Sequence, residues 1–564
     1  MSQLSEQELV RRDKLAKLRE LGINPYPADL YPLTHLSSKI KKEFKEGEKV
    51  NIAGRLMSRR IQGNASFAEL QDSEGRIQVY FNRDEICAGE DKSKYNDVYK
   101  KLLDIGDFIG IEGELFTTKV GQKSVRVTNF TLLSKALKPL PLPKEDADGN
   151  LHDAFNDPEL RYRQRYADLV VNPKVKEVFV KRTKLFNAMR SFFNEAGYFE
   201  VETPILQPIP GGAAARPFTT HHNSLDIPLY MRIANELYLK RLIVGGFDGV
   251  YEFSKNFRNE GMDRTHNPEF TAMEIYVSYK DYNWMMDFCE QLLEHCAIAV
   301  NGTSKATFGE HEIDFKAPYA RVTMADSIKH FTGFDISDKT EDEIREAAKG
   351  MGIAVDATMG KGKLIDEIFG EKCEGNYIQP TYITDYPKEM SPLCKEHRDN
   401  PELTERFELM VCGKEIANAY SELNDPIDQR ERFEHQLKLA AKGDDEATEF
   451  IDHDFLRALE YGMPPTSGMG IGMDRLIMFL TNNQSIQEVL FFPQMRPEKK
   501  ALAISEEAKD VLKILKGEEK LALNDLKGKS GLSNKKWDKT IKELTKNNLA
   551  KVDKTEEGLF VEIV

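Results

Sequence analysis

The 564-residue sequence is poor in cysteine and tryptophan and has no long hydrophobic run. No apolar stretch approaches the roughly 18 residues that cross a bilayer, so we expect no membrane protein. The first residues carry charges and lack the apolar segment of a secretory signal. None of the 6 cysteines forms a Cys-x-x-Cys pair, and no Cys/His spacing is that of a zinc finger. These absences favour a cytoplasmic protein with free thiols.

The charge balance is acidic, with 79 Lys and Arg against 93 Asp and Glu and a formal net charge of −14. Phosphate affinity comes from Lys and Arg, so we do not expect nucleic-acid binding over the whole surface. Basic stretches at residues 11–19 and 39–49 indicate either a solvated helix face or a local arm beside a nucleic-acid module. The length predicts about three or four domains.

The pattern along the chain predicts an α+β protein built from several blocks. Residues 1–48 are typical of a helical arm. Five short alternating strands, with one helix among them, predict a small OB-fold β-barrel at residues 49–138. A Pro-rich linker follows at 139–154. Residues 155–497 mix long amphipathic helices with strands, and residues 310–400 within them predict a mostly helical insertion.

The last block, residues 501–564, holds 13 lysines and 12 acidic residues. It predicts helices near 506–515, 522–529 and 535–547, and then a β-hairpin. This order is typical of a winged helix, so we expect a small C-terminal α/β appendix.

Three glycines alternate along one predicted strand, namely Gly468, Gly470 and Gly472. Strand side chains alternate with period two, so this strand has one bare face against which a flat ligand can lie. Asp474 and Arg475 then begin an apolar helix and place a cation where strand meets helix. A strand that merely packs close to a helix is the simpler alternative. The spacing matches neither a dinucleotide-binding glycine turn nor a P-loop.

Residues 257–276 predict a strand, a polar loop and a second strand. Arg258 and Glu260 are expected on one face of the first strand, and arginine is suited to a bidentate grip on phosphate or carboxylate. His266 and Asn267 in the loop can contact further phosphate oxygens. The residues of one parity in the second strand share a face: Phe270, Ala272, Glu274 and Tyr276. A structural ion pair between Arg258 and a nearby glutamate is the alternative.

With the Glu200–Pro204 segment, these stretches resemble the three signature motifs of class II aminoacyl-tRNA synthetases. Arg59-Arg60 and Ala65-Ser66-Phe67 in the barrel are similar to lysyl-tRNA synthetases. So are five further segments of the core: residues 161–166, 210–213, 232–238, 420–425 and 492–497. The resemblance covers about residues 5–497 and leaves out the C-terminal block. It implies an OB-fold domain followed by a catalytic domain built on an antiparallel sheet flanked by helices.

The family activates lysine with ATP to lysyl-adenylate, releases pyrophosphate, and transfers lysyl to the terminal adenosine of tRNA(Lys). The resemblance implies two catalytic arginines: Arg258 for the α-phosphate and the lysine carboxylate, and Arg475, with His266, for the γ-phosphate. It implies that Phe270 stacks on adenine and that Glu260 and Asn267 contact the nucleotide. Glu408 and Glu415 would carry Mg²⁺, a hard cation that prefers oxygen ligands.

A pocket for the lysine ammonium needs carboxylates and other acceptors closed off from water. The residues that supply them are Glu236, Glu274, Glu422, Asn418, Tyr276 and Tyr420. Asn418, Tyr420 and Glu422 share strand parity and should form one wall, whereas Glu415 has the opposite parity unless the strand is irregular. The resemblance adds Gly212, Ala234 and Arg258 to the lysine site. An aspartate pocket would need a cation among these carboxylates, and the sequence offers no evident candidate.

In the barrel, the resemblance implies that Phe67 stacks on an anticodon base with Arg60 and Gln78 nearby, as OB-folds bind single strands through aromatic rings and cations. A core position for Phe67 is the alternative. The family also implies a homodimer, whose interface would include the helix that ends at Gly197 and the strand at 202–204.

Three other functions compete with lysine–tRNA ligation. A sister enzyme for aspartate or asparagine would share the domain layout, but not the carboxylate pocket. A lysyltransferase that modifies a protein would lack the anticodon barrel. A non-catalytic relative would be expected to have lost Arg258, Arg475 or the Glu408 and Glu415 pair. The C-terminal block is expected to add contacts to tRNA or to another partner.

Overall fold

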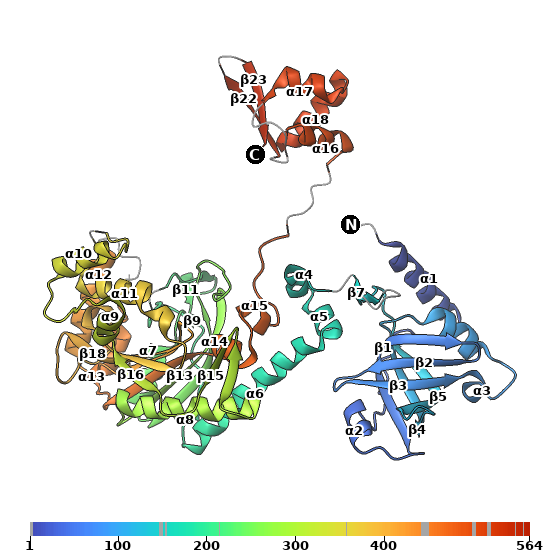
Figure 1. The fold of residues 1–564 in the computed structure, drawn as a ribbon, viewed down its shortest axis with the longest axis horizontal. Coiled ribbons are helices and arrows are strands. Elements are labelled where there is room, and N and C mark those ends of the chain that lie inside the picture. Colours follow the sequence, from blue (N-terminus) through green and yellow to red (C-terminus); the bar gives the residue numbers. More distant parts are fainter. Residues whose placement is uncertain are drawn as a thin grey trace. The chain divides into compact units, whose positions relative to one another are not determined.

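The computed structural model describes residues 4–145, 151–152, 155–213, 215–356, 358–441, 450–498, 504–515, 521–546, 549–555 and 558–563. Parts of the predicted linker (146–150 and 153–154) and residues 501–503 lie outside them. The chain forms two compact units, Met1–Gln494 and Met495–Val564 (Figure 1). Among the described residues, no helix combines the length and apolar character needed to cross a membrane.

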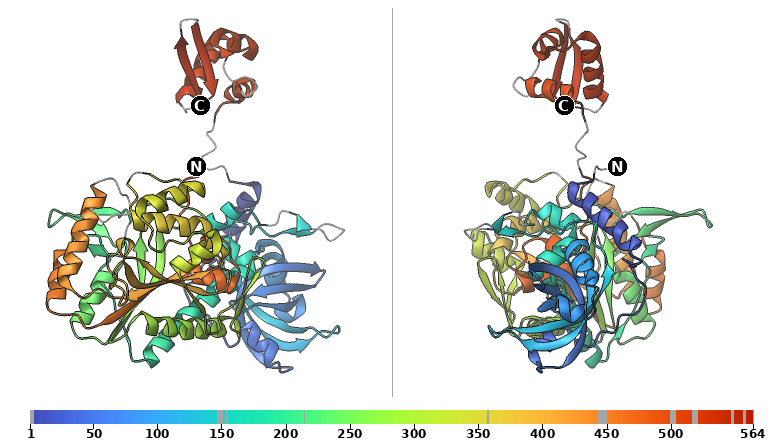
Figure 2. Two further views of the ribbon diagram at one scale, coloured as in Figure 1. Left: turned by 60° about the vertical axis from the view of Figure 1, so that its left-hand side comes forward. Right: turned by 90° about the vertical axis from the view of Figure 1, so that its right-hand side faces the viewer.

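The N-terminal part is a closed β-barrel with strand order β1-β2-β3-β5-β4 (Figure 1 and Figure 2). Its strands are β1 (Lys49–Gln62), β2 (Ala65–Gln71), β3 (Arg76–Asn82), β4 (Phe108–Thr117) and β5 (Lys123–Ser134). Helices α3 (Arg83–Ile86) and η1 (Lys94–Leu102) lie between β3 and β4. Every second residue of β2 is buried, which is the period-two pattern of a strand with one face in a core. The predicted OB-fold is confirmed.

Helices α1 (Glu6–Glu20) and α2 (Ser37–Lys42) pack on this barrel, because Leu18 and Ile40 belong to its hydrophobic core. Arg11 of the basic stretch is buried and donates to the backbone oxygens of Ile105 and Ala136. At least this part of the N-terminal charge therefore stabilises the fold.

The rest of the first unit is built on an eight-stranded sheet in the order β16-β17-β18-β19-β20-β13-β12-β8. All neighbours are antiparallel except the β12–β8 and β16–β17 pairs. The strands are β8 (Phe199–Glu200), β12 (Gly249–Phe257), β13 (Glu269–Ser278), β16 (Ala320–Thr323), β17 (Thr381–Pro387), β18 (Leu403–Val411), β19 (Lys414–Ser421) and β20 (Thr466–Gly472). A separate small sheet holds β9 (Leu206–Gln207), β10 (Thr219–His222) and β11 (Ile227–Met231).

Helices cover both faces of the large sheet, as predicted. Odd-numbered residues of β13 such as Ile275 pack with α6 (Pro173–Glu195), α8 (Tyr282–Asn301) and α14 (Met473–Thr481). On the other face, Tyr276 belongs to a cluster with α7 (Glu236–Val244), α12 (Pro426–Ala440) and α13 (His453–Glu460). The even-numbered face of β13 is the one that carries Glu274.

The predicted helical insertion at 310–400 is narrower than expected. Its helices are α9 (Met324–Thr332), α10 (Glu341–Gly350) and α11 (Lys361–Lys372), whereas β14 (Lys305–Phe308), β15 (His311–Asp314), β16 and β17 are strands. Because β16 and β17 are parallel neighbours, the chain needs a long crossover between them, and the helices supply it. The seven-residue strand β17 shows no clear alternation of apolar and polar residues, so the sequence pattern did not predict it.

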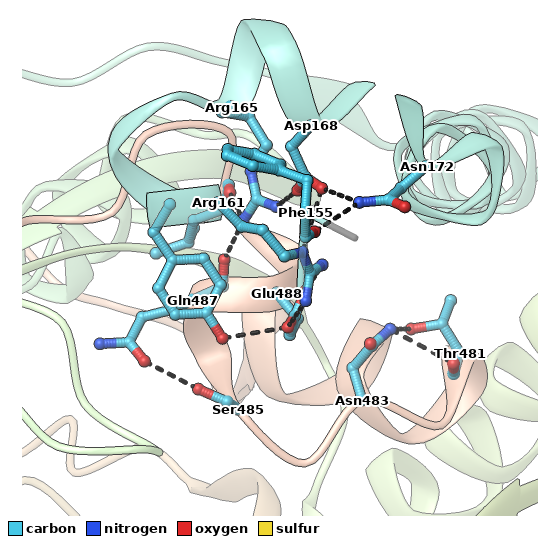
Figure 3. A network of polar contacts seen from close by, with 12 residues as sticks. Phe155, Arg161, Arg165, Asp168, Asn172, Thr481, Asn483, Ser485, Gln487 and Glu488 are labelled. Atoms are coloured by element: carbon cyan, nitrogen blue, oxygen red, sulfur yellow. Dashed lines mark hydrogen bonds and ion pairs between the residues drawn. The ribbon is translucent and has the colours of Figure 1, made fainter. Parts of the chain in front are cut away.

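A network of polar contacts holds residues 158–171 against residues 486–489 (Figure 3). It joins α4 (Pro158–Arg163) and α5 (Arg165–Val171) to α15 (Ile486–Val489). Arg161 makes a bidentate pair with Glu488, at 3.1 and 2.9 Å. Arg165 is fully buried, bonds Asp168 at 2.5 Å and donates to the backbone oxygen of Gln487 at 2.6 Å. Such charge-assisted bonds hold the two segments in one register.

The second unit has its own core and the element order of a winged helix. Its elements are α16 (Glu506–Leu515), β21 (Leu521–Ala522), α17 (Leu523–Ser530), α18 (Asn534–Lys546), β22 (Ala550–Thr555) and β23 (Gly558–Ile563). The three strands pair in the order β21-β23-β22. Trp537, Leu526 and Val561 are among the buried side chains that hold it together.

Candidate active site

The glycine-rich strand β20 lies between two strands that carry polar side chains. In register, Gly470 lies opposite Glu274 of β13 and Asn418 of β19, and Gly468 lies opposite Tyr276 and Tyr420. Because β20 has no side chains on this face, the side chains of β13 and β19 on either side of it line an open space. The bare strand face predicted from the glycine spacing is present, and the cation Arg475 follows in the first turn of α14.

The absence of a side chain at Gly468 is a steric requirement. A Cβ atom there would lie 2.6 Å from Cδ1 of Tyr276 and would clash with the carboxylate of Glu422. At Gly470 a Cβ atom would make only an ordinary contact, 3.7 Å from Cγ of Glu274. Gly468 therefore allows Tyr276 and Glu422 to approach each other across the strand.

Two adjoining cavities, of about 410 and 640 Å³, collect nearly all the predicted site residues. The residues that line the smaller one are Gly212, Ala234, Glu236, Arg258, Glu260, His266, Asn267, Phe270, Glu274, Tyr276, Glu415, Asn418, Tyr420 and Arg475. Glu408 lines the larger cavity, which also contacts Glu236, Arg258 and Glu415. Glu422 lies behind the wall, with 2% of its surface exposed.

The inner end of the smaller cavity is a cluster of buried carboxylates and tyrosines. Tyr276 donates its hydroxyl proton to Oε2 of Glu274 at 2.9 Å, and Tyr420 donates to Oε1 of Glu236 at 2.5 Å. Burial raises the pKa of Glu274 to about 8, and the neighbouring Glu236 adds to the rise. The cluster therefore favours a cation, which would stabilise its ionised form.

The cluster also holds a cation that the sequence pattern did not predict. Lys240 is fully buried, its Nζ lies 2.6 Å from Oε1 of Glu236, and it forms a second ion pair with Glu422. Burial acts to lower the pKa of Lys240, but Glu236 and Glu422 outweigh it and hold that pKa above its ordinary value. The statement that no cation stands here was wrong. Its signal in the sequence was the four-residue spacing from Glu236 on one helix.

Gly212 and Ala234 form one wall of the cluster. Gly212 has a φ of +85°, and a Cβ atom there would lie 3.2 Å from Cβ of Ala234 and 3.3 Å from Cβ of Glu236. A side chain at this position would be strained and crowded. The glycine thus allows the 210–213 loop to lie directly on the start of α7.

Arg258 lies one residue beyond the end of β12, so it and Glu260 belong to the loop and not to the strand as predicted. Its backbone N–H donates to the oxygen of Pro268 at 2.9 Å, which closes the base of the loop. The guanidinium lies 5.1 Å from the centre of the Phe270 ring. Among the described residues, its buried Nε has no hydrogen-bond partner. The Arg258 side chain lines both cavities, where a guanidinium can bind an anion.

The loop between β12 and β13 is held by its own hydrogen bonds. His266 Nδ1 lies 2.8 Å from Oδ2 of Asp263, and Asn267 donates to the oxygen of Glu269 at 2.6 Å. Burial acts to raise the pKa of Asp263, but hydrogen bonds from His266 and its neighbours hold it below its ordinary value. Glu260 accepts from the backbone N–H of Arg216 at 3.4 Å.

Glu415 reaches the cavity because strand β19 is irregular. Leu409 pairs with Ala417 and Met410 with Glu415, so one extra residue interrupts the register and shifts the face on which Glu415 lies. Regular alternation alone would have kept Glu415 away from Asn418. Arg475 donates to the backbone oxygen of Glu415, and its Nη1 lies 3.7 Å from Oε2 of the same residue.

Glu408 and Glu415 are chemically suited to a divalent cation. Burial raises the pKa of Glu408 to about 7. Arg406, which donates to Glu408 at 2.5 Å, acts to lower this pKa, and the negative charge of Glu415 acts to raise it further. The described residues hold no group of three or more His, Cys, Asp or Glu suited to a metal. Two carboxylates fit Mg²⁺, which takes few protein ligands and completes its shell with phosphate oxygens and water.

The barrel carries an aromatic platform on its outer face. Residues on either side of Phe67 in β2 are buried, whereas Phe67 is only half-buried, so it is not a core residue. Its ring lies 5.0 Å from that of Tyr80, which lies 6.0 Å from Phe116. Arg60 pairs with Phe67 across the β1–β2 ladder. Gln78 accepts a hydrogen bond from Ser124 at 2.8 Å.

Comparison with known proteins identifies the family. Residues 157–496 match the family model described as tRNA synthetases class II (D, K and N), and residues 50–133 match the OB-fold nucleic acid binding domain. A Christiangramia forsetii protein named "Lysine--tRNA ligase" is 78% identical over 563 residues, which is 100% of this chain and 99% of that one. Proteins with the same name from Porphyromonas gingivalis and Azobacteroides pseudotrichonymphae are 69% and 65% identical, each over 88% of this chain and over 87% and 99% of their own lengths. This chain belongs to the class II tRNA synthetases (D, K and N).

Proposed function

We propose that this chain is a lysine–tRNA ligase. It activates L-lysine with ATP to lysyl-adenylate, releases pyrophosphate, and transfers lysyl to the 3′-terminal adenosine of tRNA(Lys) for protein synthesis. The observation that supports the choice of lysine is a cluster of buried carboxylates. Glu236 and Glu274 line the same cavity as Arg258, and Glu422 is buried behind them. The relatives' common name supports the same choice.

The lysine ammonium is proposed to bind among Glu274, Tyr276 and Glu422. A cation there relieves the repulsion between buried carboxylates. Aspartate would instead add a fourth carboxylate to three, against the single cation Lys240, which already pairs with two of them. The remaining wall comes from Gly212, Ala234, Asn418 and Tyr420.

The carboxylate of lysine and the α-phosphate are proposed to meet at Arg258. Its side chain lines the cavity, and its buried Nε has no hydrogen-bond partner among the described residues. Phe270 lies beside this guanidinium and offers a face for adenine. Glu260, His266, Asn267 and Arg475 are proposed to contact the nucleotide. Positioning and neutralisation of charge supply most of the acceleration in such an in-line attack.

Glu408 and Glu415 are proposed to hold Mg²⁺, which would neutralise phosphate charge when bound. Arg406 and Arg475 keep the two carboxylates in place, through the Arg406–Glu408 ion pair and the bond from Arg475 to the Glu415 backbone. We propose that Arg258 and Arg475 are the catalytic arginines.

The barrel is proposed to bind the anticodon of tRNA(Lys). Phe67 and Tyr80 offer stacking surfaces, and Arg60 and Gln78 offer hydrogen bonds beside them. OB-folds commonly bind single-stranded bases in this way. The presence of this domain disfavours the protein-modifying alternative.

The chain is also proposed to act as a cytoplasmic homodimer. The side chains of Val180, Phe199 and Leu206 are 49%, 59% and 50% exposed, and they lie on α6 and the segments that follow it. Exposed apolar side chains on these segments suit a subunit interface. All 6 cysteines are free thiols, as expected in a reducing compartment. Sedimentation analysis of the purified protein tests the dimer.

The direct test is amino-acid-dependent exchange between ATP and pyrophosphate on the purified protein without tRNA, with lysine, aspartate and asparagine in parallel. We expect exchange with lysine alone. Exchange with aspartate or asparagine would contradict the carboxylate pocket. Exchange with none of the three would contradict ligase activity itself.

A further inference from the structure

Helix α18 in the second unit exposes a row of lysines. They are Lys535, Lys539, Lys542 and Lys546. At about 100° of rotation per residue, their spacing of four, three and four residues places all of them within a sector of about 60°. Trp537, Thr540 and Leu544 are buried on the opposite side of the helix. The lysine row therefore faces directly away from the core of the unit.

The lysine row is only partly neutralised by the protein, because Glu507 and Glu543 interact electrostatically with Lys539. Within the described part of the unit, none of its members forms an ion pair, although Asp538 is exposed beside them. Other lysines of the same unit do pair: Lys509 with Glu506 at 2.6 Å, Lys536 with Glu507 at 2.9 Å, Lys551 with Asp553 at 2.8 Å and Lys513 with Asp510 at 3.6 Å. On a chain of net charge −14, an unpaired row of like charge indicates an acidic partner.

The lysine row lies on the helix with which many nucleic-acid-binding proteins of this fold contact their ligand. Helices α17 and α18 are joined by a short turn in which Gly531 has a φ of +63°, so that α18 is the second helix of a helix-turn-helix. That second helix is the one that faces nucleic acid in such folds. The row has no Arg or Gln suited to bidentate base recognition. Lysine acts instead as a point charge for phosphate.

We propose that the lysine row binds the phosphate backbone of the tRNA substrate, independently of its base sequence. The inference rests on the proposed function, because tRNA is the nucleic acid on which this chain acts. The deep, narrow major groove of helical RNA excludes an α-helix, so contacts to RNA backbone need charge and no base readers, as found here. The residues of the row lie outside both matched family regions, which end at residue 496.

The test compares two full-length variants with equal loss of charge. One carries Lys535→Gln, Lys539→Gln, Lys542→Gln and Lys546→Gln. The matched control carries Lys509→Gln, Lys513→Gln, Lys536→Gln and Lys551→Gln, which removes lysines that already pair with carboxylates. The dissociation constant of a transcribed lysine tRNA is measured against salt concentration. Each lost phosphate contact lowers the salt slope by about 0.7 to 0.9, so the row variant should lose about three units and bind at least about tenfold more weakly at low salt.

The control should keep its affinity within about twofold and its slope within about one unit. Equal losses in both variants, or no loss in the row variant, would overturn the proposal. So would a duplex DNA of equal phosphate number that displaces tRNA from the parent more strongly than unlabelled tRNA does. Lysine-dependent pyrophosphate exchange without tRNA reports separately on the proposed function and should be unchanged in both variants. If the parent lacks that exchange, the ligase assignment fails, whereas the binding comparison still decides the lysine row.

Discussion

Replacing Gly468 by alanine tests the lysine pocket with a single methyl group. The new Cβ would lie 2.6 Å from Cδ1 of Tyr276 and would clash with the Glu422 carboxylate, so both side chains must move. Overpacking of this kind costs about 1–3 kcal/mol. Since about 1.4 kcal/mol corresponds to a factor of ten, the KM for lysine should rise about 5-fold to 150-fold if the strain falls on the bound state.

The assay is pyrophosphate exchange with lysine and ATP varied in turn, together with thermal unfolding to verify the fold. We expect the KM for ATP to change by less than about threefold, because neither displaced side chain belongs to the proposed nucleotide contacts. Gly470→Ala is the packing control on the same strand face, where the added Cβ makes only a 3.7 Å contact with Glu274. Because Gly470 also lines the cavity, this control is compared through the KM for lysine and not the KM for ATP. A lysine KM within twofold of the parent in Gly468→Ala, or an equal rise in the control, would refute the reasoning.

Three further predictions concern single side chains. Because Glu274 has a pKa of about 8 in the free protein, it is mostly neutral at pH 7, and its ionised form, which suits an ammonium, grows as pH rises. The kcat/KM for lysine should therefore rise about tenfold from pH 7 to above pH 8, and Glu274→Gln should abolish that rise; a flat parent profile would contradict it. Lys240→Met leaves two buried carboxylates without their cation, which costs about 3–5 kcal/mol and should lower the unfolding temperature. Saturating lysine should restore part of the loss, and an unchanged unfolding temperature would count against the buried ion pairs. Phe67→Ala should weaken tRNA binding by about 1–3 kcal/mol with pyrophosphate exchange unchanged, and an equal affinity for tRNA would place base stacking elsewhere.

Alternation predicted the faces of regular strands well. The bare face of β20 and the shared face of Glu274 and Tyr276 follow from period two alone. The same rule failed where the backbone departs from a strand. Glu415 reaches the cavity through an extra residue in β19, and Arg258 lies in a loop one residue beyond its strand. Such irregularities depend on register with neighbours distant in sequence, which no local pattern reveals.

Lys240 was missed for a different reason. Its spacing from Glu236 was visible, but a charged pair four residues apart is usually a solvated helix pair. Only the packing of α7 on the large sheet and α13 buries it, and the fold brings Glu422 to its ammonium. For Phe67, the sequence pattern allowed either a core or a surface position. Its two neighbours in β2 are buried, so Phe67 lies on the outer face of the barrel. Burial is a property of the assembled fold, and it settled both questions.

In the proposed lysine pocket, Lys240 pairs with two of the three carboxylates, and this charge balance is expected to favour lysine over neutral and acidic amino acids. Three buried carboxylates without a cation would carry a large desolvation cost, and one lysine offsets it for Glu236 and Glu422. Glu274 lies outside those ion pairs, and burial keeps it largely protonated below pH 8. A ligand ammonium would stabilise its carboxylate form, so lysine binding should release a proton. A neutral side chain would leave Glu274 protonated and gain no ion pair, and an acidic one would raise the repulsion. With all three carboxylates ionised and Lys240 as their single described cation, the pocket carries a net charge of −2, which the substrate ammonium lowers to −1. In this arrangement selectivity comes from that uncompensated negative charge.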